Sequence, residues 1–391
     1  MLKYDDLVGY FQSGCKPRSD FRFGIEWEQF SYNKSTGKPL PYYGDISILS
    51  LLNKLIADYG WSPYYEGEVI IALKRKVANG TSQFLSLEPG GQVELSGALQ
   101  KTVDDVRDEL NTYYHELVTA GDALGIGFKA IGFTPDWTRD DFHLMPKQRY
   151  KIMTEYMPKK GNLGLDMMFR TCTIQVNMDY ESEMDMINKM RVAIALQPLS
   201  TAIFANSRIK EGVDTGYASY RSHIWTDTDP DRTGMLDFVF DDDFGFCRYT
   251  DYMLNVPMYF VRRNGKYIDA SGLSFRDFMR GELPVLMGEY PTLDDWIDHV
   301  STAFPEVRLK SFIEMRGADS VPLERVADLA DFWDKMIYNP DMLNKILAII
   351  QKWDINLMKK MRNDVPRQGF LTQTPDGRNL RAFYDDLLKL L

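Results

Sequence analysis

The chain has 391 residues, of which 44% are hydrophobic and 13% aromatic, so it can bury a large core in one elaborate domain or two smaller ones. Its formal charge of −10, spread over interspersed acids and bases, argues against a general attraction to nucleic acid or an anionic membrane. The sequence lacks the roughly 18 consecutive apolar residues of a membrane helix, and its first residues lack a signal peptide, so we expect a soluble, cytoplasmic protein.

The cysteines and histidines exclude two common kinds of site. Cys15, Cys172 and Cys247 are too few and too scattered for a disulfide framework, and we expect reduced thiols. The four histidines show neither HxH nor HExxH spacing, which argues against a histidine-based zinc site. Any metal ion must therefore be held by carboxylates.

The first predicted strand, FRFGIEWEQFSY (21–32), carries two acids on one face. Glu26 and Glu28 are two residues apart, and side chains with that spacing project from the same side of a strand. Two like charges held together repel each other unless a cation lies between them. A solvated strand face with two acids is the plain alternative when this segment is considered alone.

A second acidic segment, SLEPGGQVELSGA (86–98), follows. Gln92, Glu94 and Ser96 share a strand face, and Glu88 precedes a Pro-Gly-Gly break that lets the backbone bend sharply.

Residues 102–124 show the clearest helical pattern. Apolar side chains recur at helical spacing, Thr102 with Asp105 resembles a capping box, and Gly125 is a stop signal. Beyond this helix, residues 126–133 and 256–268 are predicted strands, and the second contains an Asn264-Gly265 hairpin turn.

The segment FRTCTIQVNMD (169–179) alternates between polar and apolar residues. Its polar parity would form a wall of hydroxyls and amides, with Gln175 as an uncharged oxygen ligand. Cys172 lies on the apolar parity, so we expect it to pack in the core rather than to react.

A third acidic segment, RLKSFIEMRGAD (308–319), places Lys310, Glu314 and Arg316 on one parity of a predicted strand. From about residue 323 onward the chain becomes strongly helical. Hairpins and helices of uneven length, without regular βαβ alternation, predict an α+β fold with a curved, open, largely antiparallel sheet and helices packed outside. We expect a single catalytic domain over 1–391, with the helical region 323–391 packed on it.

Three strands that present acids beside amides or an arginine would suit Mg²⁺, which prefers carboxylate, phosphate and water oxygens. Strand parity does not establish that these faces converge. Nucleotide motifs are absent: there is no GxxxxGK[ST], and GIGFKAIG (125–132) fails GxGxxG and follows a helix. If ATP binds, it binds through metals and side chains.

Eight segments, taken in order, closely resemble the plant and alphaproteobacterial type of glutamate–cysteine ligase. They are GIEWEQF (24–30), SLEPGGQVELSGA (86–98), MPKQRYKIMTEYMP (145–158), GLDMMFRTCTIQVN (164–177), ALQPLSTAIFANS (195–207), RSHIWTDTDPDRTGM (221–235), FDDDFGFCRYTDYMLNVPMYFV (240–261) and FPEVRLKSFIEMRGAD (304–319). The resemblance implies a glutamine synthetase-like funnel with a central metal cluster.

The resemblance also implies a reaction. ATP would phosphorylate the γ-carboxylate of L-glutamate, and the amine of L-cysteine would attack the acyl phosphate to give γ-glutamylcysteine, the first step of glutathione synthesis. The implied cofactors are ATP and Mg²⁺, with Mn²⁺ as an alternative, and no nucleic acid or membrane partner is implied. The protein would be a monomer or a homodimer.

Site residues are carried over by motif. The implied magnesium ligands are Glu26, Glu28, Glu94, Gln175 and Glu314, with Glu88 as a weaker candidate. Arg316 resembles the arginine that stabilises the transferring phosphoryl group, and a salt bridge to Glu314 is its structural alternative. The residues that resemble those holding the amino acid are Arg149, Arg221 and Tyr259. Lys310 and Arg232 would meet the ATP phosphates on less specific grounds, with solvated positions as the alternative.

We expect Asp227 and Asp229 to form turns.

Three departures from the family pattern bear on function. The chain lacks the paired cysteines of plant members, which argues against a redox-controlled dimer switch. It shows no plastid transit peptide, so we expect a cytosolic protein of the bacterial type. After MRGAD the chain reads SVPLERV (320–326), where the family continues with glycines and a tryptophan. This difference leaves a ligase with a different acceptor amine as an alternative, and a non-catalytic descendant of the fold is a separate third hypothesis.

Overall fold

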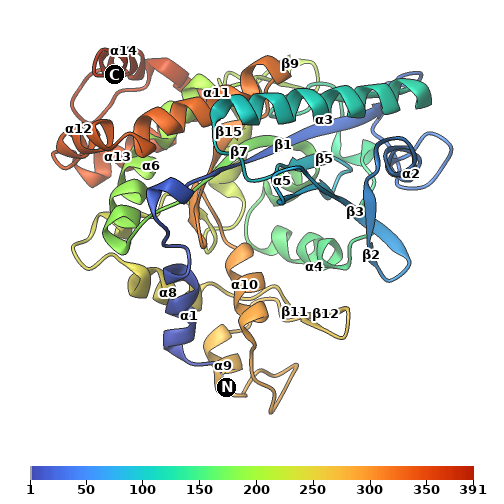
Figure 1. The fold of residues 1–391 in the computed structure, drawn as a ribbon, viewed down its shortest axis with the longest axis horizontal. Helices are drawn as coiled ribbons and strands as arrows, with labels where there is room; N and C mark the ends of the chain where they lie inside the picture. Colours follow the sequence, from blue (N-terminus) through green and yellow to red (C-terminus); the bar gives the residue numbers. More distant parts are fainter. Residues whose placement is uncertain (1) are drawn as a thin grey trace.

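A nine-stranded antiparallel sheet forms the centre of the computed structural model, which describes residues 2–391 (Figure 1). The strand order is β14-β15-β7-β1-β5-β4-β3-β2, and β6 pairs with the far end of β1. The strands are β1 (Phe23–Asn33), β2 (Ser62–Glu66), β3 (Val69–Lys76), β4 (Ser82–Leu87), β5 (Val93–Ser96), β6 (Ile126–Lys129), β7 (Thr173–Met178), β14 (Val307–Leu309) and β15 (Ile313–Asp319). The predicted α+β class with an open, largely antiparallel sheet is confirmed.

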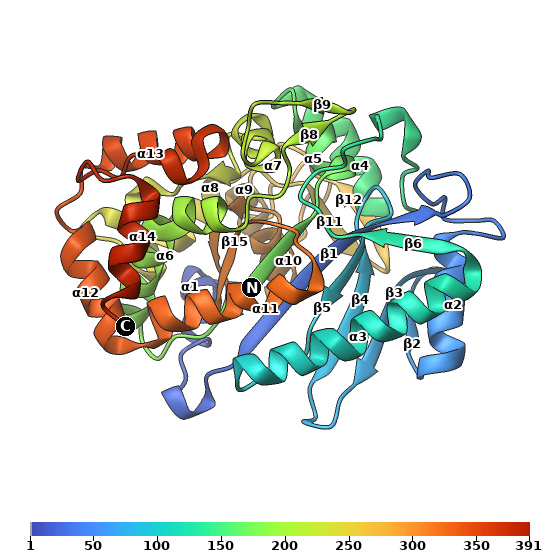
Figure 2. The same ribbon diagram turned by 90° about the horizontal axis from the view of Figure 1, so that it is seen from above.

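Helices lie on both sides of this sheet. They are α1 (Tyr4–Gln12), α2 (Ile48–Tyr59), α3 (Val103–Leu124), α4 (Gln148–Tyr156), α5 (Gly164–Arg170), α6 (Glu183–Ile203), α7 (Tyr220–Ile224), α8 (Phe246–Asn255), α9 (Phe275–Met279), α10 (Leu293–Ser301), α11 (Leu323–Trp333), α12 (Pro340–Ile350), α13 (Ile355–Gln368) and α14 (Leu380–Leu388). Helices α3 and α11 cross one face of the sheet (Figure 2). Among the described residues, none of the helices combines the length and apolar character that crossing a bilayer requires.

Short two-stranded ribbons complete the fold. They pair β8 (Ile209–Lys210) with β9 (Val213–Asp214), β10 (Thr233–Gly234) with β13 (Phe304–Pro305), and β11 (Phe260–Arg263) with β12 (Lys266–Asp269).

The two faces of the sheet differ in chemistry. On the face beneath α3, a row of fully buried side chains crosses five strands: Leu73, Leu85, Leu95, Trp27 and Ile174. Since successive side chains alternate between faces, the residues beside them in sequence point to the opposite side, which we call the site face. Glu26, Glu28, Glu94 and Gln175 lie on the site face.

Most of the predicted elements are present. Helix α3 begins after Thr102, whose hydroxyl accepts from the Asp105 amide at 3.1 Å while the Asp105 carboxylate accepts from the Thr102 amide at 3.0 Å. The β11–β12 turn holds Asn264 and Gly265 at positive φ, as an Asn-Gly hairpin requires. The strand predicted at 126–133 is shorter than expected, and β6 ends at Lys129.

The segment 308–319 is not one strand. Residues 310–312 form a turn between β14 and β15, so the predicted strand parity does not apply to Lys310. The turn brings Arg308 directly opposite Glu314 in the antiparallel register. This pairing is electrostatically favourable, and it places a further arginine beside the site face.

Replacement of Leu95 by alanine tests the importance of the buried row. Leu95 is 0% exposed, so we expect Leu95→Ala to lower the free energy of unfolding by about 3 kcal/mol, measured by urea denaturation. Leu371→Ala is the matched control, because Leu371 is 73% exposed and its truncation should cost less than about 0.5 kcal/mol. Equal losses in both variants would contradict this description of the core.

Candidate active site

A cavity of about 230 Å³ lies against the site face of the sheet. Side chains from the sheet, the 88–92 bend, α4, α5 and the 221–225 segment line it. Its lining includes nine of the residues singled out from the sequence: Glu26, Glu28, Glu88, Glu94, Arg149, Gln175, Arg221, Tyr259 and Arg316. Segments far apart in the chain therefore converge at one place.

Strand register accounts for the crowding of the acids. Glu28 of β1 lies directly opposite Glu94 of β5, and Glu26 lies opposite Gln175 of β7 on its other side. Like charges directly opposite each other destabilise an antiparallel pair, so the site face carries a built-in repulsion.

Hydrogen bonds hold three of the carboxylates. Glu94 accepts from the hydroxyls of Ser86 at 2.9 Å and Ser96 at 3.1 Å. Glu26 accepts from the side-chain amides of Gln175 at 2.8 Å and Asn177 at 3.0 Å. Glu28 accepts from the Thr173 backbone amide at 2.9 Å.

The carboxylates on this face resist ionisation. Burial, followed by the negative charges of Glu314 and Glu94, raises the pKa of Glu26 to about 7. Burial and the charge of Glu88 raise the pKa of Glu94 to about 7, and the pKa of Glu28 is also raised well above its ordinary value, first by burial and then by Glu88. The cluster would accept either protons or a cation near neutral pH.

Several polar atoms in the cavity wall are buried and have no hydrogen-bond partner. They are Gln175 Oε1, Arg149 Nε, Arg221 Nε, Arg308 Nε and Trp225 Nε1. Leaving such an atom unpaired costs about 1–3 kcal/mol, and a polar ligand in the cavity would offer these atoms partners.

Residues 2–391 contain no group of three Asp, Glu, His or Cys side chains that is close enough, as arranged, to hold a metal ion. The side-chain amides of Gln175 and Asn177 occupy the oxygens of Glu26 instead. The donor set nevertheless fits a hard cation, because carboxylates predominate and Gln175 Oε1 is buried and free of hydrogen bonds. A rotation of the Gln175 amide would turn this oxygen toward Glu26.

Glu314 lies beside the cavity in a different environment. Its carboxylate contacts Arg308 Nη2 at 2.6 Å and Arg316 Nη1 at 2.6 Å, and Lys310 Nζ lies 3.7 Å away. Burial opposes its ionisation, but Arg308 and then Arg316 outweigh burial and hold the pKa of Glu314 well below its usual range. The salt-bridge alternative for Arg316 is thus present, while Arg316 also lines the cavity.

The three residues expected to hold the amino acid all line the cavity. Arg221 is 2% exposed and donates through Nη2 to the Arg316 carbonyl at 3.0 Å, which leaves its Nε without a partner. Arg149 lies beside Tyr150, with its Nη2 3.5 Å from the phenolic oxygen. Tyr259 is 1% exposed, and its hydroxyl lies 3.4 Å from Asp229.

Arg232 lies outside the cavity lining, and its placement is at odds with the expected contact to nucleotide phosphates. The side chain is 0% exposed and pairs with the equally buried Asp229 at 2.9 Å. Its guanidinium lies over the Tyr259 ring, 3.5 Å from the centroid. Arg232 therefore packs on the ring of Tyr259. Asp229 is the buried ion-pair partner of Arg232 rather than only a turn residue.

Sequence reasoning missed two buried cations at this site. Arg308 is anchored by the carbonyls of Ser301 and Ala303, both at 2.8 Å, in addition to Glu314. Arg308 faces Glu314 across the β14–β15 turn, a pairing that spacing along a single strand does not reveal. Lys147 donates to the Leu87 carbonyl at 2.7 Å, and burial and then Arg149 lower its pKa to about 8.

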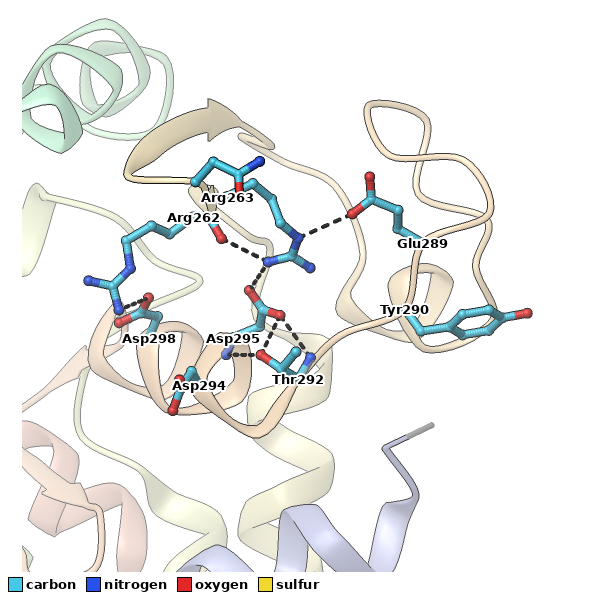
Figure 3. A pocket seen from close by; sticks show the side chains of 9 residues that line it. Arg262, Arg263, Glu289, Tyr290, Thr292, Asp294, Asp295 and Asp298 are labelled. Atoms are coloured by element: carbon cyan, nitrogen blue, oxygen red, sulfur yellow. Dashed lines mark hydrogen bonds and ion pairs between the residues drawn. The ribbon is translucent and has the colours of Figure 1, made fainter.

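A second hollow, of about 440 Å³, lies on the surface at α10 and the β11–β12 ribbon (Figure 3). Its charges are already paired: Arg263 binds Asp295 at 2.7 Å and Glu289 at 3.1 Å, and Arg262 lies 3.5 Å from Asp298. Within residues 2–391, none of the unpartnered buried polar atoms belongs to a residue that lines this hollow, whereas five belong to residues that line the smaller cavity, so we place the candidate active site there.

Comparisons with known proteins identify the family to which the chain belongs. The family model described as "Glutamate-cysteine ligase family 2 (GCS2)" matches residues 22–384. The chain is 50% identical over 389 residues to glutamate–cysteine ligase A, chloroplastic, of Oryza sativa subsp. japonica, covering all of this chain and 77% of that protein. It is 49% identical over the same length to the chloroplastic enzyme of Arabidopsis thaliana, covering 73% of it.

A solved structure shares the fold. Glutamate–cysteine ligase from Francisella tularensis, in complex with AMP, aligns with a TM-score of 0.55 at 13% identity, covering 94% of this chain and 77% of that one.

The relatives correct one expectation. A cytoplasmic location was expected from the first residues of the chain, but the relatives are named as chloroplastic enzymes, which contradicts that expectation. The first few residues are a weak guide to location, whereas the similarity to these relatives extends over 389 residues. The family resemblance inferred from the motifs is confirmed: this chain belongs to glutamate–cysteine ligase family 2.

Proposed function

We propose that this protein joins the γ-carboxylate of L-glutamate to the amine of L-cysteine at the expense of ATP, which is the first step of glutathione synthesis. The observation that carries the proposal is the single cavity in which acids of β1 and β5 face Arg149, Arg221 and Arg316, in a chain of this family. Residues 1–391 act as one catalytic domain; a continuous hydrophobic core that includes both Leu7 and Leu387 supports this organisation.

ATP would activate the γ-carboxylate of glutamate by phosphorylating it. A carboxylate is a poor acyl donor because its leaving group would be oxide. The γ-carboxylate must therefore be phosphorylated, so that the attacking amine can displace phosphate. The complex of the Francisella tularensis relative with AMP supports the use of an adenine nucleotide. Lys310 is the candidate phosphate contact, because it lies at the β14–β15 turn beside Glu314.

Glu26, Glu28, Glu94, Gln175 and Glu314 are the proposed ligands for Mg²⁺, or alternatively Mn²⁺, with Glu88 at the edge of the set. The ions would neutralise the phosphates as the terminal phosphoryl group moves. The chain contributes a set of carboxylates that repel one another once they lose their protons. A bound cation would relieve this repulsion. Glu314 would have to exchange at least one arginine contact for the ion.

The arginines that line the cavity have two different proposed roles. Glu314 fixes one nitrogen of Arg316 at 2.6 Å, which aims its guanidinium at the cavity, where it would stabilise the charge on the moving phosphoryl group. Arg149 and Arg221 each present a buried, unpartnered Nε, and an arginine can hold the α-carboxylate of glutamate with two parallel hydrogen bonds.

Measurement of ADP release with L-glutamate and a panel of acceptor amines tests the proposed reaction. We expect L-cysteine to stimulate ADP release far more than L-serine or L-alanine does, with γ-glutamylcysteine as the product by mass spectrometry. Equal stimulation by all amines would instead favour a ligase with a different acceptor. Absence of ADP release with every amine would favour a non-catalytic descendant.

Substitution of Arg316 by lysine tests the phosphoryl-stabilising role. Lysine keeps the charge but loses the planar, two-pronged contact, so we expect kcat to fall at least about a hundredfold while circular dichroism is unchanged. Arg325→Lys, on the exposed side of α11, is the matched control and should keep normal turnover. A kcat for Arg316→Lys within twofold of the parent would refute the assignment.

The raised pKa values predict how pH and magnesium affect stability. Glu26 and Glu94 titrate near 4.5 in the unfolded chain but near 7 when folded, so their contribution to stability falls as pH rises from about 4.5 to about 7. We expect Mg²⁺ to raise Tm more at pH 8, where these acids are charged, than at pH 5.

Glu94→Gln removes one of the repelling charges. At pH 8 without divalent cations we expect it to raise Tm by about 2 °C or more and to reduce the stabilisation by Mg²⁺, measured by differential scanning calorimetry. The exposed Glu68→Gln is the control and should change neither quantity. A magnesium effect that is independent of pH and of Glu94 would contradict a cation site among these acids.

A further inference from the structure

The site face of the sheet continues beyond the cavity onto the two strands β4 and β3. In the antiparallel register, Ser96 of β5 lies opposite Glu26 on one side and Phe84 on the other. Lys74 of β3 lies opposite Phe84. Because cross-strand partners project to the same side, these side chains form one row that begins at the acids and runs outward.

Phe84 is exposed where its strand neighbours are not. Phe84, whose side chain projects from the site face, is 36% exposed, whereas Leu85, next in sequence, is 0% exposed on the core face. Lys74 is also exposed, and its Nζ lies 5.2 Å from the centre of the Phe84 ring. Single exposed aromatic residues are ordinary on protein surfaces, but this one lies in register with the acids of the site face.

The spacing of the row suits a nucleotide. Neighbouring strands lie about 4.8 Å apart, so the Phe84 ring is two strands, or about 10 Å, from the Glu26 carboxylate. An extended nucleoside triphosphate places its base and its terminal phosphate at opposite ends of a span of this order. Lys310, 3.7 Å from Glu314, adds a positive charge at the phosphate end, and Lys74 adds one at the outer end.

We propose that Phe84 and Lys74 form the subsite for the nucleoside of the ATP co-substrate. The base stacks on the Phe84 ring, and the flexible Lys74 side chain turns from the ring toward the ribose or the first phosphate. This assignment rests on the proposed use of ATP and adds the place where the nucleoside lies. Stacking on an aromatic ring tolerates any base, so the subsite contributes affinity rather than selectivity for adenine.

Binding calorimetry with the full-length protein separates the nucleoside from the phosphates. The probes are Mg·ADP and Mg·tripolyphosphate, which lacks a base and a ribose. We expect Phe84→Ala to weaken Mg·ADP binding about tenfold or more, to leave Mg·tripolyphosphate binding unchanged, and to weaken Mg·GDP binding by a similar factor. Phe84→Trp should keep or strengthen the binding of Mg·ADP.

Tyr290→Ala is the matched control, because Tyr290 is a 40% exposed aromatic residue at the separate surface hollow (Figure 3). It should bind both probes normally. Unchanged Mg·ADP affinity in Phe84→Ala, equal weakening of both probes, or a parent protein that binds no Mg·ADP would each overturn the subsite. Failure of the proposed ligase reaction would appear separately, as Mg·ADP binding without cysteine-dependent turnover in the parent protein.

Discussion

Repulsion among buried carboxylates is the constraint on which the rest of this structure depends. Glu28 faces Glu94 across the β1–β5 pair, and Glu26 lies two residues away on the same strand face. Such an arrangement is unfavourable by itself, and it is tolerated because the reverse face of the same strands is fully buried under α3. The hydrophobic core thus holds acids together that would separate in a less rigid sheet.

The electrostatics divide the site into two parts. Glu314 stays ionised because Arg308 and Arg316 contact it directly, whereas Glu26 and Glu94 have pKa values of about 7 and change charge easily. One part is already neutralised by protein cations, and the other can be neutralised by either protons or a cation. This asymmetry is what an enzyme requires if the metal-bound nucleotide is to supply the missing positive charge.

Short-range patterns in the sequence predicted the parts of this site but not their arrangement. Alternation identified the polar face of β7 with Gln175, and capping signals identified α3. Parity could not show that Glu28 pairs with Glu94, because register depends on partners distant in the chain. The 310–312 turn has no Gly, Pro or Asn to signal it, so Arg308 went unnoticed. Arg232 was expected at phosphates because neither its own motif nor its charge reveals the buried pairing with Asp229.

Anomalous diffraction from crystals soaked with Mn²⁺ and ADP would test the central claim most directly, since Mn²⁺ can replace Mg²⁺ at oxygen sites and its position is observed without assumption about ligands. We expect manganese peaks within coordination distance of Glu26, Glu28 and Glu94, between the strands and the nucleotide phosphates. Bound ADP with no manganese among these acids, or manganese held elsewhere on the protein, would contradict it.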